Sequence, residues 1–242
     1  MTTQNPIITR YKKNPILTKD DVPYPVSTVH NAGIVKHNGR YIMLFRSHRH
    51  NGRSIIGRAD SDDGFSFIVR PEPFLSPAMN TVFAEYEEFG VEDLRICPVE
   101  GEYLLSYSAY SRHGVRIALA RTTDFEDVER IALITQADLR NVVIFPVKFG
   151  GRYVRLDRPH SEISPWSIWI TYSPDLRFWG ESQLVMKPHG SADRQAVTGR
   201  GRRGCQGNAP KPPIQGNSNG IARPIEPVLT AQSSPESLCQ GF

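Results

Sequence analysis

Residues 33–47 read GIVKHNGRYIMLFRS, in which two alternating apolar runs flank Asn38-Gly39. An Asn-Gly pair in this position is typical of a two-residue hairpin turn, because both residues tolerate a positive φ. Tyr41 opens the second run, whose side chains suit a half-buried strand. The stretch therefore predicts an antiparallel β-hairpin.

The same pattern occurs twice more along the chain. Residues 95–109, RICPVEGEYLLSYSA, turn at Glu100-Gly101, and residues 143–159, VIFPVKFGGRYVRLDRP, turn at Gly150-Gly151. Repetition at intervals of about 50 to 60 residues indicates a repeat architecture.

A further strand follows each hairpin and ends in Ser or Thr and then Asp, side chains that bond nearby backbone amides in turns. The three turn pairs are Ser61-Asp62, Thr123-Asp124 and Ser173-Asp175. A unit of strand, hairpin, strand, turn and strand is typical of a β-propeller blade. We therefore expect an all-β chain of about three blades; a single antiparallel domain with irregular repeats is the alternative.

The pattern ends near Gly190, which predicts a partial propeller over residues 1–190 and a separate tail over 191–242. Gly, Pro, Ser, Gln and Arg dominate this tail, and its only aromatic residue is Phe242. Such a composition cannot bury enough apolar area to offset chain entropy. The tail is either naturally disordered or the out-of-frame translation of a gene damaged after residue 190. Because three blades leave open sheet edges, we expect the chain alone not to be a stable, active enzyme.

Charge and composition narrow the function classes. The net charge is +4, but six basic and three acidic residues lie in 191–242, so the body is nearly neutral and nucleic acid is not an expected partner. No apolar run approaches the ~20 residues of a membrane span, and the N-terminus lacks a secretory pattern. The three cysteines are far apart, and no spacing suits a metal. We expect a cytoplasmic protein without membrane partners or metal, and a homo-oligomer is compatible with the sequence.

Residues 14–190 resemble glycoside hydrolase family 130, whose members are five-bladed propellers and mostly inverting β-mannoside phosphorylases. The resemblance rests on an ordered set of motifs: NPIL, HNAGIVKHNGRYIMLFRS, GVEDLRI, YLLSYSAYS, IALART and NVVIFPVKFGGRYVRLDRP. Family members usually read Glu-Asp-Pro-Arg where this chain has Leu94 in place of Pro. The family's later Tyr-His-Gly motif, whose His contacts phosphate, has no counterpart after Gly190.

This resemblance implies inverting phosphorolysis of β-1,4-mannosides to α-mannose 1-phosphate. Phosphate attacks the anomeric carbon, and one aspartic acid drives protonation of the leaving oxygen through a mannose hydroxyl. Inorganic phosphate is then a co-substrate beside the β-mannosyl oligosaccharide, no cofactor is needed, and arginines suit the phosphate site.

The matched motifs imply roles for individual residues. Asp93 is the catalytic acid and Glu92 the alternative, because consecutive strand residues point to opposite faces and only one can enter the pocket. Asn31 and Arg46 hold the mannosyl unit, while Arg95 orients Asp93, lines the sugar site or forms a structural ion pair. The phosphate-binding residues are Arg140 and Arg158.

Two other functions remain open. Some relatives with this fold hydrolyse mannosides with water, and they lack the basic phosphate cluster. A non-catalytic, sugar-binding propeller remnant is the second alternative, favoured by the abrupt end of the repeats.

Overall fold

The structure is a computed structural model that describes residues 10–160 and 166–188, all within one compact unit spanning residues 1–201. It is all-β, as predicted, apart from a single 3-10 turn at Lys19–Asp21. The strands are β1 (Thr28–His37), β2 (Arg40–His48), β3 (Ser54–Ser61), β4 (Ile68–Val69), β5 (Gly90–Val99), β6 (Glu102–Ser111), β7 (Gly114–Thr122), β8 (Glu129–Leu133), β9 (Leu139–Ile144), β10 (Tyr153–Pro159), β11 (Ile168–Ser173) and β12 (Gly180–Met186).

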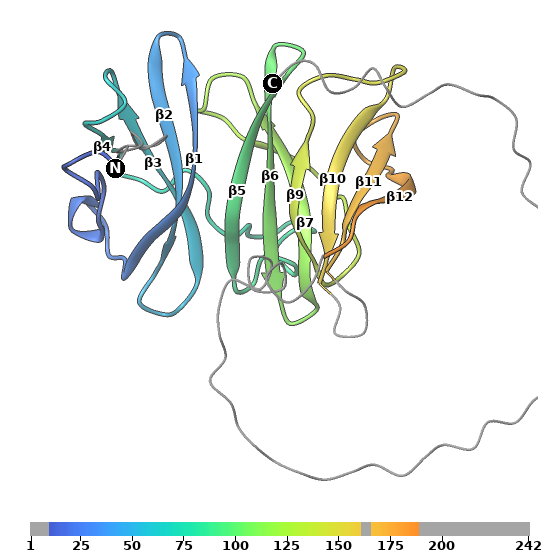
Figure 1. The fold of residues 1–242 in the computed structure, drawn as a ribbon. Coiled ribbons are helices and arrows are strands. Elements are labelled where there is room, and N and C mark those ends of the chain that lie inside the picture. The colour runs from blue at the N-terminus through green and yellow to red at the C-terminus, as the bar shows by residue number, and fades with distance from the viewer. Residues whose placement is uncertain (1–9, 161–165, 189–242) are drawn as a thin grey trace, which may run out of the picture. The chain divides into compact units, whose positions relative to one another are not determined.

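The strands form three successive four-stranded units (Figure 1), which we name unit A (β1–β4), unit B (β5–β8) and unit C (β9–β12). Within each unit the strands pair antiparallel in chain order. Units A and B are also joined by one parallel backbone pairing, between Ser54 and Gly90. The repeat seen in the sequence is therefore a repeat of the structure.

The three predicted hairpin turns are confirmed. Both central residues of each turn have positive φ: Asn38 and Gly39 at 47° and 83°, Glu100 and Gly101 at 51° and 86°, Gly150 and Gly151 at 57° and 76°. A turn with two positive φ values matches the right-handed twist of the strands it joins. These turns hold the first and second strands of each unit in register.

The turn between the third and fourth strands is also repeated, but two of the three polar pairs predicted for it from the sequence are wrong. The bonded pairs are Ser61 with Asp63, Thr122 with Asp124, and Ser173 with Asp175. In each pair the hydroxyl and the carboxylate accept bonds from the backbone amides that follow. The spacing is thus two residues, because the two side chains must close one turn together.

Apolar side chains join each unit to the next. One cluster contains Ile42 and Leu44 of unit A with Leu105 and Tyr107 of unit B. A second contains Leu104 and Ile117 of unit B with Val142 and Ile144 of unit C. Burial of this surface stabilises the row of units, since each face would otherwise meet water.

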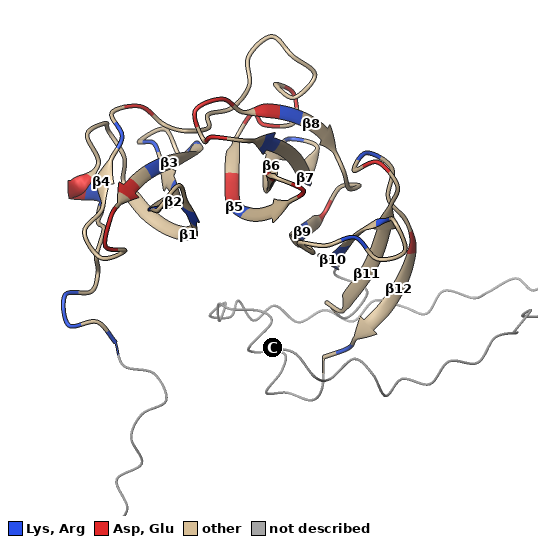
Figure 2. Ribbon diagram, turned by 90° about the horizontal axis from the view of Figure 1, so that it is seen from above, with Lys and Arg blue, Asp and Glu red and all other residues tan. Residues whose placement is uncertain are grey.

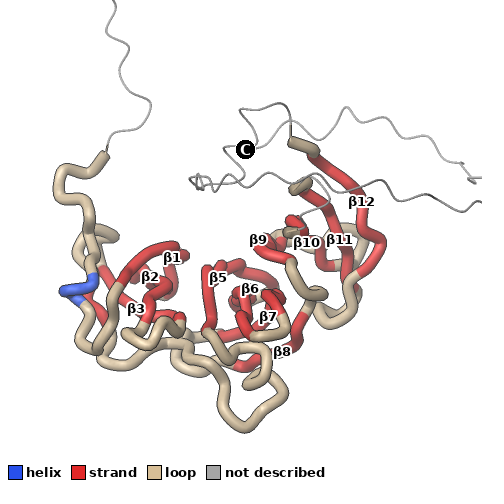
Figure 3. The backbone as a smooth tube through the Cα atoms, turned by 90° about the horizontal axis from the view of Figure 1, so that it is seen from below, coloured by secondary structure: helices blue, strands red, loops and turns tan. Residues whose placement is uncertain are grey.

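The first strand of each unit lies on the inner side of the row. Figures 2 and 3 show β1, β5 and β9 facing a common concave side, and Figure 2 shows β4 and β8 on the outside. The inner strands are close enough for β1 to contact β5 and for β5 to contact β9. Side chains that leave these three strands inward therefore converge.

Each inner strand carries a β-bulge at the same place. Register shifts occur between His30 and Gly33 on β1, between Glu92 and Arg95 on β5, and opposite Asp157 on β9. The bulge residue with positive φ is Asn31 on β1 (48°), Asp93 on β5 (53°) and Asn141 on β9 (60°). A bulge re-aims a side chain, and Asn and Asp are the non-glycine residues that best tolerate this conformation.

Several predictions lie outside the described residues. The tail over residues 191–242, its disorder and its origin all fall there, and the described strands end at Met186. No helix in the described part of the chain is long and apolar enough to cross a bilayer.

Candidate active site

The Asp93 side chain lies at the β5 bulge, where it is only 17% exposed. Its Oδ1 accepts a hydrogen bond of 2.7 Å from Asn31 Nδ2 and one of 3.1 Å from an Arg46 guanidinium nitrogen. Its Oδ2 accepts no hydrogen bond from the described residues. One carboxylate oxygen is therefore held in place while the other remains available to a substrate.

Arg46 contacts both acidic residues, which corrects the sequence argument that only one could enter the pocket. One terminal nitrogen donates to Asp93, and the other lies 2.7 Å from Glu92 Oε1. Strict alternation would place the two carboxylates on opposite faces. The bulge at Asp93 interrupts that alternation, so consecutive side chains reach one guanidinium.

Glu92 is the more deeply buried of the two acids, with 6% of its side chain exposed. Besides Arg46, its Oε1 accepts a bond of 3.1 Å from the Ser54 hydroxyl. Its Oε2 lies 3.1 Å from a terminal nitrogen of Arg140, on β9. Both oxygens are occupied, which leaves Glu92 poorly suited to be the alternative acid.

His48 completes the surroundings of Arg46. Its Nε2 lies 3.0 Å from the Arg46 nitrogen that contacts Glu92, and its Nδ1 lies 2.9 Å from the Thr28 hydroxyl. A guanidinium can only donate, so Nε2 is the acceptor and the ring is neutral. Burial lowers the pKa of His48, and the Arg46 charge lowers it further, which favours the same neutral form.

Burial on its own would raise the pKa of Asp93, but the Asn31 hydrogen bond and the Arg46 charge outweigh it and hold the pKa below its usual value. Asp93 is therefore ionised at neutral pH in the free site. To act as an acid, Asp93 must gain a proton when substrates bind. An incoming anion and the exclusion of water both raise the pKa of this carboxyl group and so favour that protonation.

Arg140 and Arg158 are direct partners across the β9–β10 pair. Residues paired in this way share a face of the sheet, with Cβ atoms about 5 Å apart. Burial lowers the pKa of Arg158, and the charge of Arg140 lowers it further. Two neighbouring cations repel one another, and an anion bound between them would relieve that repulsion.

Arg95 forms no ion pair with Asp93 in the described part of the chain, whereas its role in lining the sugar site stays a prediction. It lies beyond the bulge, its side chain is exposed, and Asn31 and Arg46 hold the Asp93 carboxylate instead. No ion pair to Arg95 is present among residues 10–160 and 166–188, so neither the orienting role nor the structural ion pair is supported.

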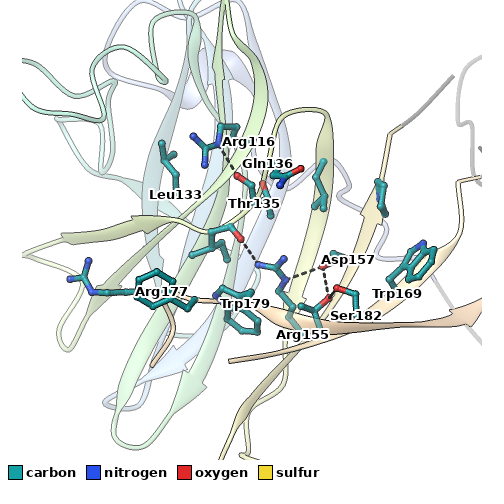
Figure 4. A pocket seen from close by; sticks show the side chains of 15 residues that line it. Arg116, Leu133, Thr135, Gln136, Arg155, Asp157, Trp169, Arg177, Trp179 and Ser182 are labelled. Atoms are coloured by element: carbon teal, nitrogen blue, oxygen red, sulfur yellow. Dashed lines mark hydrogen bonds and ion pairs between the residues drawn. The ribbon is translucent and has the colours of Figure 1, made fainter. Parts of the chain in front are cut away.

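A cavity of about 530 Å³ lies elsewhere, between units B and C (Figure 4). Its arginines are already engaged: Arg116 with the Thr135 carbonyl, Arg155 with Asp157 and the Ile134 carbonyl, and Arg177 with the Ile131 carbonyl. None of the side chains that contact Asp93 lines it. We interpret it as a gap between units whose polar groups serve the fold.

The site is thus built by all three units. Unit A supplies Asn31 and Arg46, unit B supplies Glu92 and Asp93, and unit C supplies Arg140, with Arg158 beside it. Where the structure describes the chain, no three His, Cys, Asp or Glu residues are grouped to hold a metal. The arrangement combines one available carboxyl oxygen with a cluster of cations.

The sequence analysis missed two residues that contact the site, His48 and Ser54, and the bulge residue Asn141. His48 follows Arg46 by two residues on one strand, a spacing that places both on the same face and could have indicated contact. Ser54 gave no local signal, because it meets Glu92 only through the pairing of β3 with β5. Asn141 could have been found by aligning the three inner strands, since it occupies the position of Asn31 and Asp93.

Several known proteins are similar to this chain. Listeria innocua beta-1,2-mannobiose phosphorylase is 40% identical over 134 residues, covering 55% of this chain and 36% of that protein. Ruminococcus albus beta-1,4-mannooligosaccharide phosphorylase is 27% identical over 188 residues, covering 75% and 56%. The solved structure of the Listeria enzyme with beta-1,2-mannobiose superposes with a TM-score of 0.67 at 28% identity, covering 75% of this chain and 67% of that one.

This chain spans about a third to three fifths of the length of the curated relatives it matches first. The sequence profile of glycoside hydrolase family 130, described as beta-1,4-mannooligosaccharide phosphorylase, matches residues 2–193. With that match and the repeated all-β units, this chain belongs to glycoside hydrolase family 130.

Proposed function

We propose that this protein cleaves β-mannosides by inverting phosphorolysis. A phosphate oxygen attacks the anomeric carbon from the face opposite the leaving group, and the bond from that carbon to the leaving oxygen breaks. The leaving oxygen takes a proton supplied by Asp93, directly or through a sugar hydroxyl. The products are α-mannose 1-phosphate and the shortened acceptor sugar.

One observation carries the choice of phosphate over water. An inverting hydrolase needs a second carboxylate, free to activate water, about 6.5–9.5 Å from the acid. The acidic neighbour here, Glu92, has both oxygens engaged by Arg46, Ser54 and Arg140. The adjacent cations Arg140 and Arg158 suit a phosphate dianion, because a guanidinium binds phosphate oxygens in pairs.

The linkage is a finer part of this proposal. The family description and the Ruminococcus relative name β-1,4-mannooligosaccharides, whereas the Listeria relative is named for β-1,2-mannobiose. We retain β-1,4 as the predicted linkage and β-1,2 as the alternative that the assay must include.

The decisive experiment detects the phosphorylated product of the reaction. The chain is incubated with β-1,4- or β-1,2-mannobiose and phosphate, and 31P NMR detects mannose 1-phosphate. Asp93→Asn should lower turnover by at least ~100-fold. Arg158→Ala should raise the phosphate KM about 10- to 150-fold and change sugar binding less, since a charge-assisted bond is worth about 1.5–3 kcal/mol.

Three outcomes would contradict the proposal. Release of free mannose without phosphate identifies a hydrolase, and mannobiose binding without any product, both in the chain and in the fusion described below, identifies a sugar-binding remnant. Undiminished turnover in Asp93→Asn removes that residue from the chemistry. If the 242-residue chain is inactive, residues 1–188 joined to the remaining C-terminal part of the Listeria enzyme provide the form to assay.

We also propose that units A, B and C are three blades of a five-bladed propeller, in a cytoplasmic protein. Support comes from unit C, where Val143, Leu184, Val185 and Met186 remain exposed, while the corresponding surfaces between A, B and C are buried. Reading the coding DNA beyond codon 190 in all three frames tests whether further blades are encoded there.

A further inference from the structure

We propose that Glu92 is a positioning residue that couples the sugar-binding and phosphate-binding halves of the site. It holds Arg46 of unit A and Arg140 of unit C on its two oxygens, and so fixes both guanidinium groups relative to Asp93. This inference rests on the proposed phosphorolysis for its kinetic consequences, but its structural part can be tested without turnover.

The geometry assigns each oxygen of Glu92 a separate task. Oε1 receives Arg46 at 2.7 Å and the Ser54 hydroxyl at 3.1 Å, whereas Oε2 receives Arg140 at 3.1 Å. A planar carboxylate with both oxygens bonded cannot rotate without breaking at least one ion pair. The two arginines are therefore held at a constant separation, although they belong to units that could shift relative to one another.

The ion pairs of Glu92 are buried, so losing one of them should disrupt the site more than losing an exposed ion pair would. Glu92 exposes 6% of its side chain, Arg46 13% and Arg140 30%. Removing one partner of a buried pair leaves the others uncompensated, which is far more disruptive than losing an exposed pair. The Ser54 bond adds a further restraint, from the strand that joins unit A to unit B.

Asp93 gives the arrangement a chemical consequence. Arg46 is shared between Glu92 and Asp93, so the negative charge of Glu92 limits how strongly Arg46 stabilises the ionised form of Asp93. Replacing Glu92 by a neutral residue removes a nearby like charge and leaves Arg46 to Asp93 alone. Both changes lower the pKa of Asp93. The groups around Asp93 that enter this balance are His30, Asn31, Arg46, His48, Glu92 and Arg140.

The first test is Glu92→Gln in the full chain, with the guanidinium NH signals of Arg46 and Arg140 followed by NMR and assigned with Arg→Lys variants. We expect the restrained signals of both arginines to be lost or shifted. Glu87→Gln is the matched control, because Glu87 is also buried and is bonded to Arg130 and Tyr107, but lies outside the Asp93 cluster. It should lower the melting temperature and leave the Arg46 and Arg140 signals in place.

Kinetics of the form that turns over supply the second readout. Glu92→Gln should raise the KM values for both mannobiose and phosphate at least about tenfold, the lower end for a charge-assisted bond. The alkaline limb of its kcat profile, which reports loss of the proton from the acid in the enzyme–substrate complex, should move to lower pH. A residue that only stabilised the fold would produce neither change in the folded enzyme.

The outcomes separate this inference from the proposed function. If only one arginine responds, or if Glu92→Gln changes melting alone as Glu87→Gln does, the coupling role is wrong. If Glu92→Gln does not fold, Ser54→Ala replaces it, and the same two signals must shift by a smaller amount, with no shift refuting the role. If wild type makes no mannose 1-phosphate but both arginines respond, phosphorolysis fails and the positioning role stands.

Discussion

Gly90→Ala is expected to be strongly destabilising, because this glycine begins β5 where unit B meets unit A. Its φ is +142°, and an added Cβ would lie 2.5 Å from the backbone nitrogen of Ser54, 2.7 Å from its Cβ and 2.8 Å from its carbonyl oxygen. Real Cβ contacts are never this short, and backbone atoms cannot move aside independently. Ser54 would have to shift, and with it the hydroxyl that bonds Glu92.

The magnitude follows from two terms. A side chain at strongly positive φ costs about 1–2 kcal/mol, and overpacking costs about 1–3 kcal/mol. Together they give about 2–5 kcal/mol, a large part of the ~5–15 kcal/mol that stabilises a typical domain. At about 2–4 °C per kcal/mol for a chain of this size, the melting temperature should fall by about 4–20 °C.

Gly101→Ala is the matched control for this experiment. Gly101 has a φ of +86°, but nothing lies within 4 Å of its added Cβ, so only the backbone term remains. We expect a loss of about 1–2 kcal/mol there. Thermal melts would be compared with hydrogen exchange in peptides covering residues 52–61 and 88–99, which should lose protection only in Gly90→Ala. Equal effects of the two substitutions would refute the role of the close approach to Ser54.

Other predictions concern packing, pH and the chain as a whole. Phe125 is 1% exposed, so Phe125→Ala should lower the free energy of unfolding by about 3–5 kcal/mol. Because its φ is 65°, which glycine tolerates better than alanine, Phe125→Gly should cost about 1 kcal/mol less than Phe125→Ala in urea melts, although glycine is usually the more damaging of the two. Burial lowers the pKa values of His30 and His48 below 6.5, so the unfolded chain binds more protons, and the melting temperature should fall as pH drops below about 6.5. A double His→Gln variant should flatten that dependence, and a steeper one would contradict its cause. Sedimentation and melting of the 242-residue chain test the expectation that it is not stable alone, which a monodisperse, cooperatively melting, active monomer would disprove.

Much of the fold was predictable because local chemistry specifies it. The hairpins at Asn38-Gly39, Glu100-Gly101 and Gly150-Gly151 need residues that accept positive φ, and such residues can be recognised in the amino-acid sequence. The turn pairs were less certain, since several Ser, Thr and Asp residues stand together and only the folded turn selects Asp63 over Asp62.

The site was harder to predict because a bulge changes which way side chains point. Alternation separates Glu92 from Asp93 and places Arg95 with Asp93, and the β5 bulge overturns both expectations. The contacts of Glu92 with Ser54 and Arg140 join residues 38 and 48 positions apart, so no local pattern could reveal them. Pairings between units determine such contacts, and one sequence does not display them.

The bulge shared by β1, β5 and β9 also limits what this protein could become. At Asn31, Asp93 and Asn141 the backbone bends into the left-handed region, where β-branched and bulky residues are strained. Substitutions that preserve the backbone there are confined mainly to Asn, Asp, Gly and His. The functional side chains that these inner positions can acquire by mutation are thus mainly amides, carboxylates and imidazoles. A new reaction on this scaffold would have to be composed largely from those groups, with other chemistry entering from neighbouring positions.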